Sequence, residues 1–302
     1  MFDIIGDIHG YASKLEALLL KLGYEKKNGS YRHPKRKALF VGDYIDRGPE
    51  IRETLRIIRT MVENDQAIAL MGNHEYNALC FHFKDSLGGH LRKHSIKNMI
   101  QHYETIKQFQ NRQAEYEEYL EWFFWLPLFI DLPEFRATHA CWSDANIAYL
   151  SALLPENRLN SELLYTSTER NSRLFTAIDE TLKGKEIPMP AGLSFNDKDG
   201  TKRTDIRIKW WEDPAKSTYK SISVLPLATL PELPVEKSVS FDNHYAETEK
   251  PVFFGHYWLK GTPQLLRNNI CCTDYSVAKG GYLTAYRSEK NQVLKDLNFV
   301  FV

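Results

Sequence analysis

The sequence has no excess of charge of either sign. Its 302 residues include 39 Lys and Arg and 39 Asp and Glu, which gives a formal net charge of zero at pH 7. A chain without net charge has no global field that would hold it on nucleic acid or on an anionic membrane, although local charged patches are compatible with this balance. General binding to either kind of surface is therefore not expected.

The chain also lacks a long apolar run. A membrane-spanning helix needs about 20 consecutive apolar residues, and the richest run, 122–132, is shorter and is interrupted by Pro127. The first residues read as a strand and not as the basic and then apolar pattern of a secretory signal. We expect a protein that does not enter a membrane.

Cysteine is scarce, with four residues in the whole chain, Cys80, Cys141, Cys271 and Cys272. The last two are adjacent in a strand-like run, so the spacing gives no sign of a disulfide framework. We expect reduced cysteines and a cytoplasmic protein. The length suits one large domain with a substantial core, or two small ones.

One pattern occurs three times near the start of the chain. Each of the apolar runs 2–5, 38–41 and 67–71 is followed by a loop that combines glycine with carboxylate, amide or imidazole side chains. The loops read Gly6-Asp7-Ile8-His9-Gly10, Gly42-Asp43-Tyr44-Ile45-Asp46-Arg47-Gly48 and Gly72-Asn73-His74-Glu75. Carboxylate oxygen and imidazole nitrogen are ligands of Mn, Fe, Zn and similar ions, and glycine lets the backbone approach an ion closely. The pattern therefore predicts a metal site.

Helical periodicity fills the segments between these runs. Leucines at helical spacing predict a helix over 11–22, and an apolar stripe predicts another over 49–64. This alternation of strands and helices predicts neighbouring parallel strands, with the ligands gathered at their C-terminal ends. Further strands are expected over 128–132, 251–254, 270–274, 282–287 and 293–302.

Residues 76–125 are helical in character and contain four histidines, His82, His90, His94 and His102. The Gly88-Gly89 pair interrupts this region and favours two helices over one. No carboxylate or cysteine accompanies the histidines at ligand spacing, so a metal cluster is not expected among them. His90, Arg92 and Lys93 are candidates for the rim of a substrate site.

Residues 151–250 differ in composition from the rest of the chain, because polar stretches alternate there with prolines. Residues 197–200 form a turn signal that predicts a hairpin between 193–195 and 204–211. We expect an insertion or cap made of short helices and this hairpin. The basic and aromatic run 203–211 is either an ordinary amphipathic strand or a surface that meets an anionic, nucleotide-containing substrate. Its members are Arg203, Arg207, Lys209, Trp210 and Trp211.

The three loops, in this order and at these intervals, resemble the motifs of the calcineurin-like metallophosphoesterases. They are most similar to the phosphoprotein-phosphatase-type branch, which includes symmetrical diadenosine tetraphosphatases and the phosphatase module of bacterial polynucleotide kinase-phosphatases. His139 and Gly255-His256 match the two later metal histidines of the family. The resemblance covers residues 1–150 and about 250–290.

The resemblance implies an α/β fold, a sandwich of two mixed β-sheets flanked by helices, with the ligands on loops at one edge. We expect one metallophosphoesterase domain over residues 1–302, with 151–250 as an insertion or cap within it. The implied cofactor is a pair of divalent metal ions, manganese first, with iron, zinc or nickel as alternatives. The first ion would be held by Asp7, His9 and Asp43. The second would be held by Asp43 as a bridging ligand and by Asn73, His139 and His256.

The implied chemistry is hydrolysis of phosphate esters or anhydrides. Two ions about 3.5–4 Å apart can bind a shared water, lower its pKa and direct the resulting hydroxide at phosphorus for in-line attack. The resemblance assigns His74 as the general acid that protonates the leaving oxygen. Asp46 would keep His74 protonated and oriented, and Arg47 would bind a phosphate oxygen with two donors. Arg47, Asn73 and His74 together form the implied substrate-binding group.

One position departs from the pattern of this branch. Protein Ser/Thr phosphatases usually carry an arginine directly before the Gly-Asn-His-Glu motif, and here Met71 stands there. A second phosphate-binding arginine is therefore missing or supplied from elsewhere, such as the cap. This departure favours a nucleotide, a dinucleoside polyphosphate or a small phosphoester over a phosphoprotein.

Several alternatives stay open. A diadenosine tetraphosphatase-like nucleotide hydrolase, a serine/threonine protein phosphatase and a polynucleotide phosphatase all fit the motifs, so phosphoprotein and nucleic acid remain candidate partners. A non-catalytic phosphate-binding protein on the same fold would be expected to lack a ligand or the acid, and this sequence has the full set.

Overall fold

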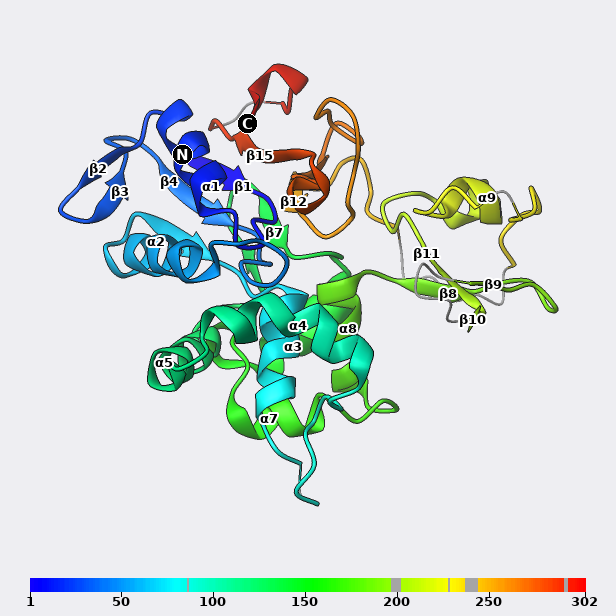
Figure 1. Cartoon of the computed structure of the whole chain (residues 1–302). Helices are drawn as coiled ribbons and strands as arrows, with labels where there is room; N and C mark the ends of the chain where they lie inside the picture. Colours follow the sequence, from blue (N-terminus) through cyan, green and yellow to red (C-terminus); the bar gives the residue numbers. More distant parts are fainter. Residues whose placement is uncertain (86, 197–201, 228, 237–243, 291–292) are drawn as a thin grey trace.

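The computed structural model describes residues 1–85, 87–196, 202–227, 229–236, 244–290 and 293–302 (Figure 1). Its larger sheet has six strands with β1 near the centre, in the order β14-β15-β1-β4-β5 with β16 beside β15. The strands are β1 (Phe2–Ile5), β4 (Lys37–Phe40), β5 (Ala67–Ala69), β14 (Asp274–Tyr275), β15 (Tyr282–Arg287) and β16 (Phe299–Phe301). β1, β4 and β5 are parallel, as predicted, and β15 is antiparallel to β1. The parallel strands therefore end at one edge of a mixed sheet.

The second sheet has four strands in the order β13-β12-β7-β6. They are β6 (Phe129–Asp131), β7 (Arg136–Thr138), β12 (Val252–Phe254) and β13 (Ile270–Cys272). β12 is parallel to both of its neighbours and β6 is antiparallel to β7. This sheet is mixed as well, and β7 and β12 lead directly to the predicted ligands His139 and His256.

The two sheets face each other across one apolar layer. Ile4 and Leu39 of the larger sheet belong to the same buried cluster as Ala137, Phe253 and Cys271 of the smaller one. Alternate residues of each strand point to the opposite face, where they contact the helices. The sandwich of two mixed sheets flanked by helices is therefore confirmed.

Helices α1 (Ala12–Lys21) and α2 (Ile51–Glu63) cover the outer face of the larger sheet (Figure 1). Leu15 of α1 and Leu55 of α2 are fully buried in the cluster that contains Phe40 of β4. Both helices were predicted to within two residues at each end. A short hairpin of β2 (Glu25–Lys27) and β3 (Ser30–Arg32) connects α1 to β4.

The region 76–125 forms three helices and not the two that were predicted. They are α3 (Asn73–His82), α4 (Ile96–Gln108) and α5 (Gln113–Phe123). The unpredicted break falls at Asn111, which has a left-handed φ of 61°. Asparagine tolerates this conformation better than most residues, so a helix can end here without the glycine or proline that usually marks a break.

Four more helices and two short ladders follow β7. The helices are α6 (Asp144–Leu153), α7 (Ser161–Thr166), α8 (Arg173–Lys183) and α9 (Tyr219–Ile222). The described residues also form short 3₁₀ turns at 155–157, 214–216, 277–279 and 296–298. In Figure 1, α7 and α8 lie with α3, α4 and α5 in the lower part of the molecule. The described residues between 186 and 236 (186–196, 202–227 and 229–236), which we call the arm, project to one side.

The arm contains two antiparallel ladders with different partners from those predicted. β8 (Glu186–Pro188) pairs with β11 (Asp205–Arg207), and β9 (Phe195–Asn196) pairs with β10 (Lys202–Arg203). A hairpin that begins at Phe195 is present, as predicted, but its second strand is β10 and not 204–211, because β11 pairs with β8 instead. The predicted turn at 197–200 lies outside the described residues.

The arm has a small core of its own, which includes Ile187, Ile206, Ile208, Tyr219 and Ile222. The two tryptophans that follow β11 point away from this core and into the body. Trp210 and Trp211 are 6% and 4% exposed, and the Trp210 indole donates a hydrogen bond to the Ala140 carbonyl. Neither ring is available to stack on a nucleobase, which favours the amphipathic-strand interpretation for the aromatic part of the run 203–211.

The four cysteines are buried and free. Within the described part of the chain, none of the helices has the length and apolar character that crossing a membrane requires.

Candidate metal centre and active site

The predicted ligands converge at the sheet edge where β1, β4, β5, β7 and β12 end. Six residues of these loops are held in the left-handed region, with φ between 50° and 71°. They are His9, Asp43, Asp46, Arg47, His256 and Trp258. Such a conformation costs a residue with a Cβ about 1–2 kcal/mol. Strain of this kind persists only where the surrounding structure imposes it, and it concentrates at functional sites.

Two glycines are required by close approach to the carboxylates. A Cβ on Gly255 would lie 1.9 Å from Asp7 Oδ1, and a Cβ on Gly72 would lie 2.3 Å from Asp43 Oδ1. No other residue fits at either position without displacing a carboxylate. The glycines of these loops therefore serve the packing of the site as well as the turn of the chain.

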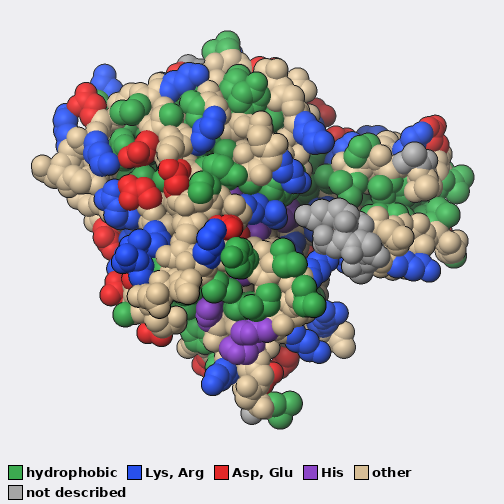
Figure 2. Space-filling view, in the orientation of Figure 1, with side chains coloured by type: hydrophobic (Ala, Val, Ile, Leu, Met, Phe, Trp, Pro, Cys, Tyr) green, Lys and Arg blue, Asp and Glu red, His purple; other side chains and the backbone are tan. Residues whose placement is uncertain are grey.

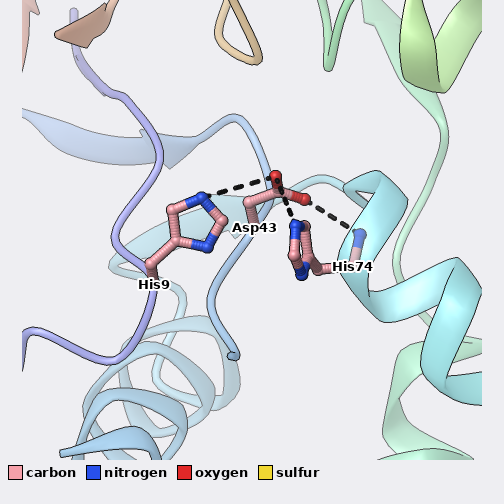
Figure 3. A group of neighbouring side chains, drawn as sticks. All are labelled: His9, Asp43 and His74. Atoms are coloured by element: carbon pink, nitrogen blue, oxygen red, sulfur yellow. Dashed lines mark hydrogen bonds and ion pairs between the residues drawn. The ribbon is translucent and has the colours of Figure 1, made fainter. Parts of the chain in front are cut away.

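Asp43 lies between two groups of imidazoles. In the first group, His9 Nε2 and His74 Nε2 are each 3.8 Å from Asp43 Oδ2. The His74 backbone N–H also donates to Asp43 Oδ1 at 3.0 Å, which fixes the carboxylate (Figure 3). The candidate ligand atoms of this group lie within 4.8 Å of one another, close enough for one ion.

His9 presents a free lone pair to this group. Its Nδ1 donates to the Ile45 carbonyl at 3.1 Å, which leaves Nε2 without a proton. Nε2 is buried and has no hydrogen-bond partner among the described residues. Burial and the nearby His74 lower the pKa of His9 to about 3. The ring is thus neutral, and its orphaned nitrogen is suited to a metal.

The second group contains Asp43, His139 and His256. His139 Nδ1 donates to the Val41 carbonyl at 2.8 Å, so Nε2 carries the lone pair. That Nε2 lies 3.3 Å from Asp43 Oδ1 and 3.1 Å from Asn73 Oδ1. Three electron-rich atoms facing one another are unfavourable unless a positive charge lies between them.

The raised pKa of His139 also indicates that a positive charge is favourable at this position. Burial lowers this pKa, but the Asp43 carboxylate, the hydrogen bond to the Val41 carbonyl and the Glu75 charge together outweigh burial and raise it above its usual value. A divalent ion would satisfy the three atoms in place of a proton. The residues of this group therefore fit a metal ion.

Asp7 is held by the loop that carries His256. Its Oδ2 accepts the backbone N–H of His256 at 3.0 Å, and it is not among the ligand atoms of either group of three. Burial and the charges of Asp274 and Asp43 raise the pKa of Asp7 well above its usual value. Buried carboxylates that repel one another favour binding of a cation.

His74 and Asp46 form a hydrogen-bonded pair, with His74 Nδ1 2.5 Å from Asp46 Oδ2. Burial lowers the pKa of His74, but the Asp43 charge and the Asp46 hydrogen bond outweigh it and raise the pKa above its usual value. A histidine held protonated beside the ligands can donate a proton. The contact predicted between these two residues is present.

His102 and Thr105 of α4 complete the environment of Asp46, and both were missed from the sequence. Asp46 Oδ1 accepts hydrogen bonds from His102 Nδ1 at 2.7 Å and from the Thr105 hydroxyl at 2.6 Å. Burial raises the pKa of Asp46, but His102 and the hydrogen bonds from His102 and His74 hold it well below its usual value. The sequence signal was only that His102 and Thr105, three apart in a helix, share a face.

Trp258 is a second residue without a predicted role. Its ring stacks on His9 at a centroid distance of 5.4 Å, and the Arg47 guanidinium lies 4.6 Å from its centroid. Arg47 Nε is buried without a hydrogen-bond partner among the described residues. The indole therefore supports Arg47 through a cation–π contact, and the guanidinium keeps unused hydrogen-bonding capacity.

The site opens into a cleft of about 300 Å³. It is lined by Asp43, Arg47, Asn73, His74, Asn77, Arg92, Gln101, Lys183, Arg207, His256 and Trp258. Four of these side chains are basic and one is acidic, and Figure 2 shows blue and purple side chains in the hollow beside the arm. The cleft is thus suited to an anion.

Arg207 reaches the cleft from β11 at the base of the arm. Its Nη1 donates to His256 Nε2 at 3.0 Å, and its Nη2 donates to Glu186 at 3.1 Å. Of the predicted rim residues, Arg92 lines the cleft, while His90 and Lys93 are not in its lining. The His90 ring stacks on His94 instead, at a centroid distance of 3.9 Å.

A two-sheet α/β sandwich with carboxylate and imidazole side chains gathered at one sheet edge is the arrangement of a metallophosphoesterase. The chain belongs to the calcineurin-like phosphoesterase family, whose profile matches residues 1–257. The resemblance drawn from the three loops is thereby confirmed.

Relatives with assigned names match part of the chain. Bis(5′-nucleosyl)-tetraphosphatase PrpE (asymmetrical) of Oceanobacillus iheyensis is 30% identical over 167 residues, which are 55% of this chain and 61% of that protein. The protein of the same name from Halalkalibacterium halodurans is 36% identical over 143 residues, which are 46% of this chain and 56% of that protein. The chain thus spans between half and two thirds of the length of these relatives.

Solved structures of two phosphatases share the fold. A cold-active protein-tyrosine phosphatase of a psychrophile, Shewanella sp., has a TM-score of 0.52 at 18% identity, covering 99% of this chain and 79% of that chain. A protein serine/threonine phosphatase from Saccharomyces cerevisiae has a TM-score of 0.51 at 14% identity, covering 100% of this chain and 78% of that chain. At these identities the likeness concerns the fold alone.

Proposed function

We propose that this chain is a metal-dependent phosphoesterase that hydrolyses phosphate esters or anhydrides. The observation that carries the proposal is the position of Asp43, whose carboxylate lies between two groups of buried imidazoles. One acidic side chain shared by two ligand groups is what a pair of neighbouring divalent ions requires.

The proposed ligand sets are those that the family resemblance implies. Asp7, His9 and Asp43 would hold one ion, and Asp43, Asn73, His139 and His256 would hold the other. Bound there, the ions supply Lewis acidity toward phosphate oxygens and make a water acidic near neutral pH. We propose manganese as the native ion, with iron, zinc and nickel as alternatives that the same oxygen and nitrogen donors accept.

The remaining roles belong to this chain's own side chains. Arg47, supported by Trp258, binds and orients a phosphate oxygen with its unused donors. His74 donates a proton to the leaving oxygen, because Asp46 holds it protonated and fixes its ring. Arg207 is placed to act as the second phosphate-binding arginine, which compensates for Met71.

For the substrate we propose a nucleotide phosphoanhydride, and dinucleoside polyphosphates first. Two observations support this choice. The relatives with assigned names are nucleosyl tetraphosphatases, and the cleft is basic and compact, with four cations in its lining. A polynucleotide stays a candidate with less support, because Trp210 and Trp211 are buried and cannot stack on bases. A phosphoprotein has less support because Met71 replaces the arginine usual in protein phosphatases.

The cap and the compartment are proposals as well. We propose one metallophosphoesterase domain over residues 1–302, with 151–250 as a cap inserted between the ligands His139 and His256. Arg207 supports the idea of a cap, because it comes from this segment and touches His256. The four free cysteines support a reducing compartment, the cytoplasm.

The test compares the parent with Asp43→Asn and His74→Asn in the presence of Mn, with p-nitrophenyl phosphate as the substrate. We expect His74→Asn to lower kcat by about 10²–10⁴-fold and Asp43→Asn to lower it by at least as much. Asp65→Asn is the matched control, because Asp65 is exposed and its ion pair, with Lys37, lies outside the lining of the cleft. The parent should bind about two ions per chain by elemental analysis. Variants with full activity and unchanged ion content would refute the proposal.

A further inference from the structure

Arg92 places a positive charge in the cleft at a distance from the ligand groups. It lies in the loop between α3 and α4, and its guanidinium donates to Asn77 Oδ1 at 3.1 Å and to Gln101 Oε1 at 2.8 Å. Among the described residues, no carboxylate forms an ion pair with it. Burial lowers the pKa of Arg92 below its usual value, so its charge is partly removed from water without a counter-ion.

Three of the basic side chains of the cleft are accounted for in other ways. Lys183 is paired with Asp179 at 2.5 Å, and Arg207 is paired with Glu186. Arg47 lies over Trp258, and its unused donors are the ones we assign to the reacting phosphate. A partly buried cation held by two neutral amides is costly unless an anion joins it. Among the described residues, Arg92 is therefore the cation of this cleft that has neither an ion pair nor an assigned ligand.

The amides around Arg92 are turned so that they too can bind an anion. A guanidinium has no acceptor, so Asn77 and Gln101 must face it with their oxygens. Their NH₂ groups then point elsewhere, and neither group has a hydrogen-bond partner among the described residues. Both residues line the cleft. Arg92, Asn77 and Gln101 thus form a cluster that offers only donors to the cleft, which we call the Arg92 cluster.

The Arg92 cluster is one helical turn away from the proposed metal ligands. Asn73 and Asn77 both belong to α3 and are four residues apart, so they share a face and are separated by about 6 Å along the axis. The cleft joins the two places without interruption. A group bound at Arg92 would be separate from the group bound at the metal ligands, yet both can belong to one molecule.

We propose that the Arg92 cluster is a second phosphate subsite, which binds another phosphate group of the same substrate beyond the phosphate that reacts. The ligand class is a linear phosphate chain, as in nucleoside or dinucleoside polyphosphates. Phosphate oxygens accept hydrogen bonds and carry charge, and a guanidinium binds two of them at once. The inference rests on the proposed function and adds the residues that would distinguish a phosphate chain from a simple monoester.

The test compares two substrates and one inhibitor in Arg92→Gln, with Mn present. For bis(5′-adenosyl) tetraphosphate we expect kcat/KM to fall by about tenfold or more, mainly through KM, because a charged hydrogen-bonding partner of phosphate is lost. The inhibition constant of inorganic tripolyphosphate should rise by a similar factor. For p-nitrophenyl phosphate kcat/KM should stay within about twofold, because a monoester does not reach Arg92.

Two further variants separate binding from folding. Arg52→Gln is the matched control, since Arg52 pairs with Glu115 outside the cleft, and it should change none of these values. Arg92→Lys keeps the positive charge but loses the paired donors of the guanidinium. The kcat/KM for the tetraphosphate should therefore fall by an intermediate factor. Melting temperatures show whether each variant is folded. If Arg92→Gln is not folded, Arg92→Lys serves as the test instead.

The results distinguish the subsite from the proposed function. An active parent with an Arg92→Gln variant that is unchanged, or equally impaired on both substrates, would overturn the subsite and leave the hydrolase intact. A parent that hydrolyses neither substrate would overturn the proposed function. Titration calorimetry with tripolyphosphate needs no turnover, so it would still test whether the subsite exists. Equal affinity of the parent and Arg92→Gln for tripolyphosphate would refute the subsite.

Discussion

Both oxygens of Asp46 are hydrogen-bonded, and this arrangement decides how His74 is held. Oδ2 binds His74, while Oδ1 binds His102 and the Thr105 hydroxyl. The carboxylate therefore cannot rotate without breaking contacts on its far side. His102 acts on His74 through Asp46, which makes it a positioning residue.

His102→Gln should slow turnover without weakening substrate binding. The loss of a hydrogen bond to a charged group costs about 1.5–3 kcal/mol, so we expect kcat for p-nitrophenyl phosphate to fall by about tenfold or more. KM should stay within about twofold, because His102 does not line the cleft. Steady-state kinetics measures both values. His90→Gln is the control, and equal kcat in both variants would contradict this role for His102.

From the sequence, we identified the site residues that lie in recognisable motifs. We missed the residues that reach the site only through tertiary packing. His9, Asp43 and His74 are named by their loops, and each stands next to a glycine or in a short polar turn. His102 and Trp258 carry no such mark. A histidine within a helix does not reveal which side chain it will face across the fold, so its partner appears only with the tertiary structure.

At the scale of elements, the described part of the arm contributes Arg207, at its base, to the lining of the cleft. Its own small core includes Ile206 and Ile222, while Arg207, next to Ile206 on β11, points the other way and contacts His256. Successive residues of a strand face opposite sides, so one strand joins the arm to the cleft. The sequence predicted strands here but gave β11 the wrong partner, because a turn signal identifies the nearest hairpin and not a more distant pairing.

Arg207→Gln tests whether the arm takes part in binding. We expect kcat/KM for p-nitrophenyl phosphate to fall by about tenfold, since a charged donor near the reacting phosphate is lost. The melting temperature should change little, because Arg207 is partly exposed and its pair with Glu186 lies near the surface. Arg173→Gln on α8 is the matched control, since Arg173 lies over Tyr149 and is not in the lining of the cleft. Activity equal to that of the control would remove Arg207 from the site.

At the scale of the whole molecule, the site joins segments that are far apart in the chain. The proposed ligands run from Asp7 to His256, and they come from both sheets of the sandwich. Burial and the nearby carboxylates of Asp274 and Asp43 raise the pKa of Asp7, so a cation is favourable beside these buried acids. A site with these properties is stabilised by metal ions in the folded state and has no counterpart in the unfolded chain.

Metal removal should therefore destabilise the whole fold and not only abolish activity. At an ion concentration about 100 times the dissociation constant, one bound ion adds about 2.7 kcal/mol to the free energy of unfolding. Each kcal/mol shifts the melting temperature of a large domain by about 2–4 °C, so Mn should raise the melting temperature of chelator-treated protein by several degrees. Thermal unfolding followed by fluorescence measures the shift. Asp65→Asn should respond as the parent does, whereas Asp43→Asn should lose most of the response because both ligand groups share Asp43. A full response in Asp43→Asn would mean that the ions bind elsewhere.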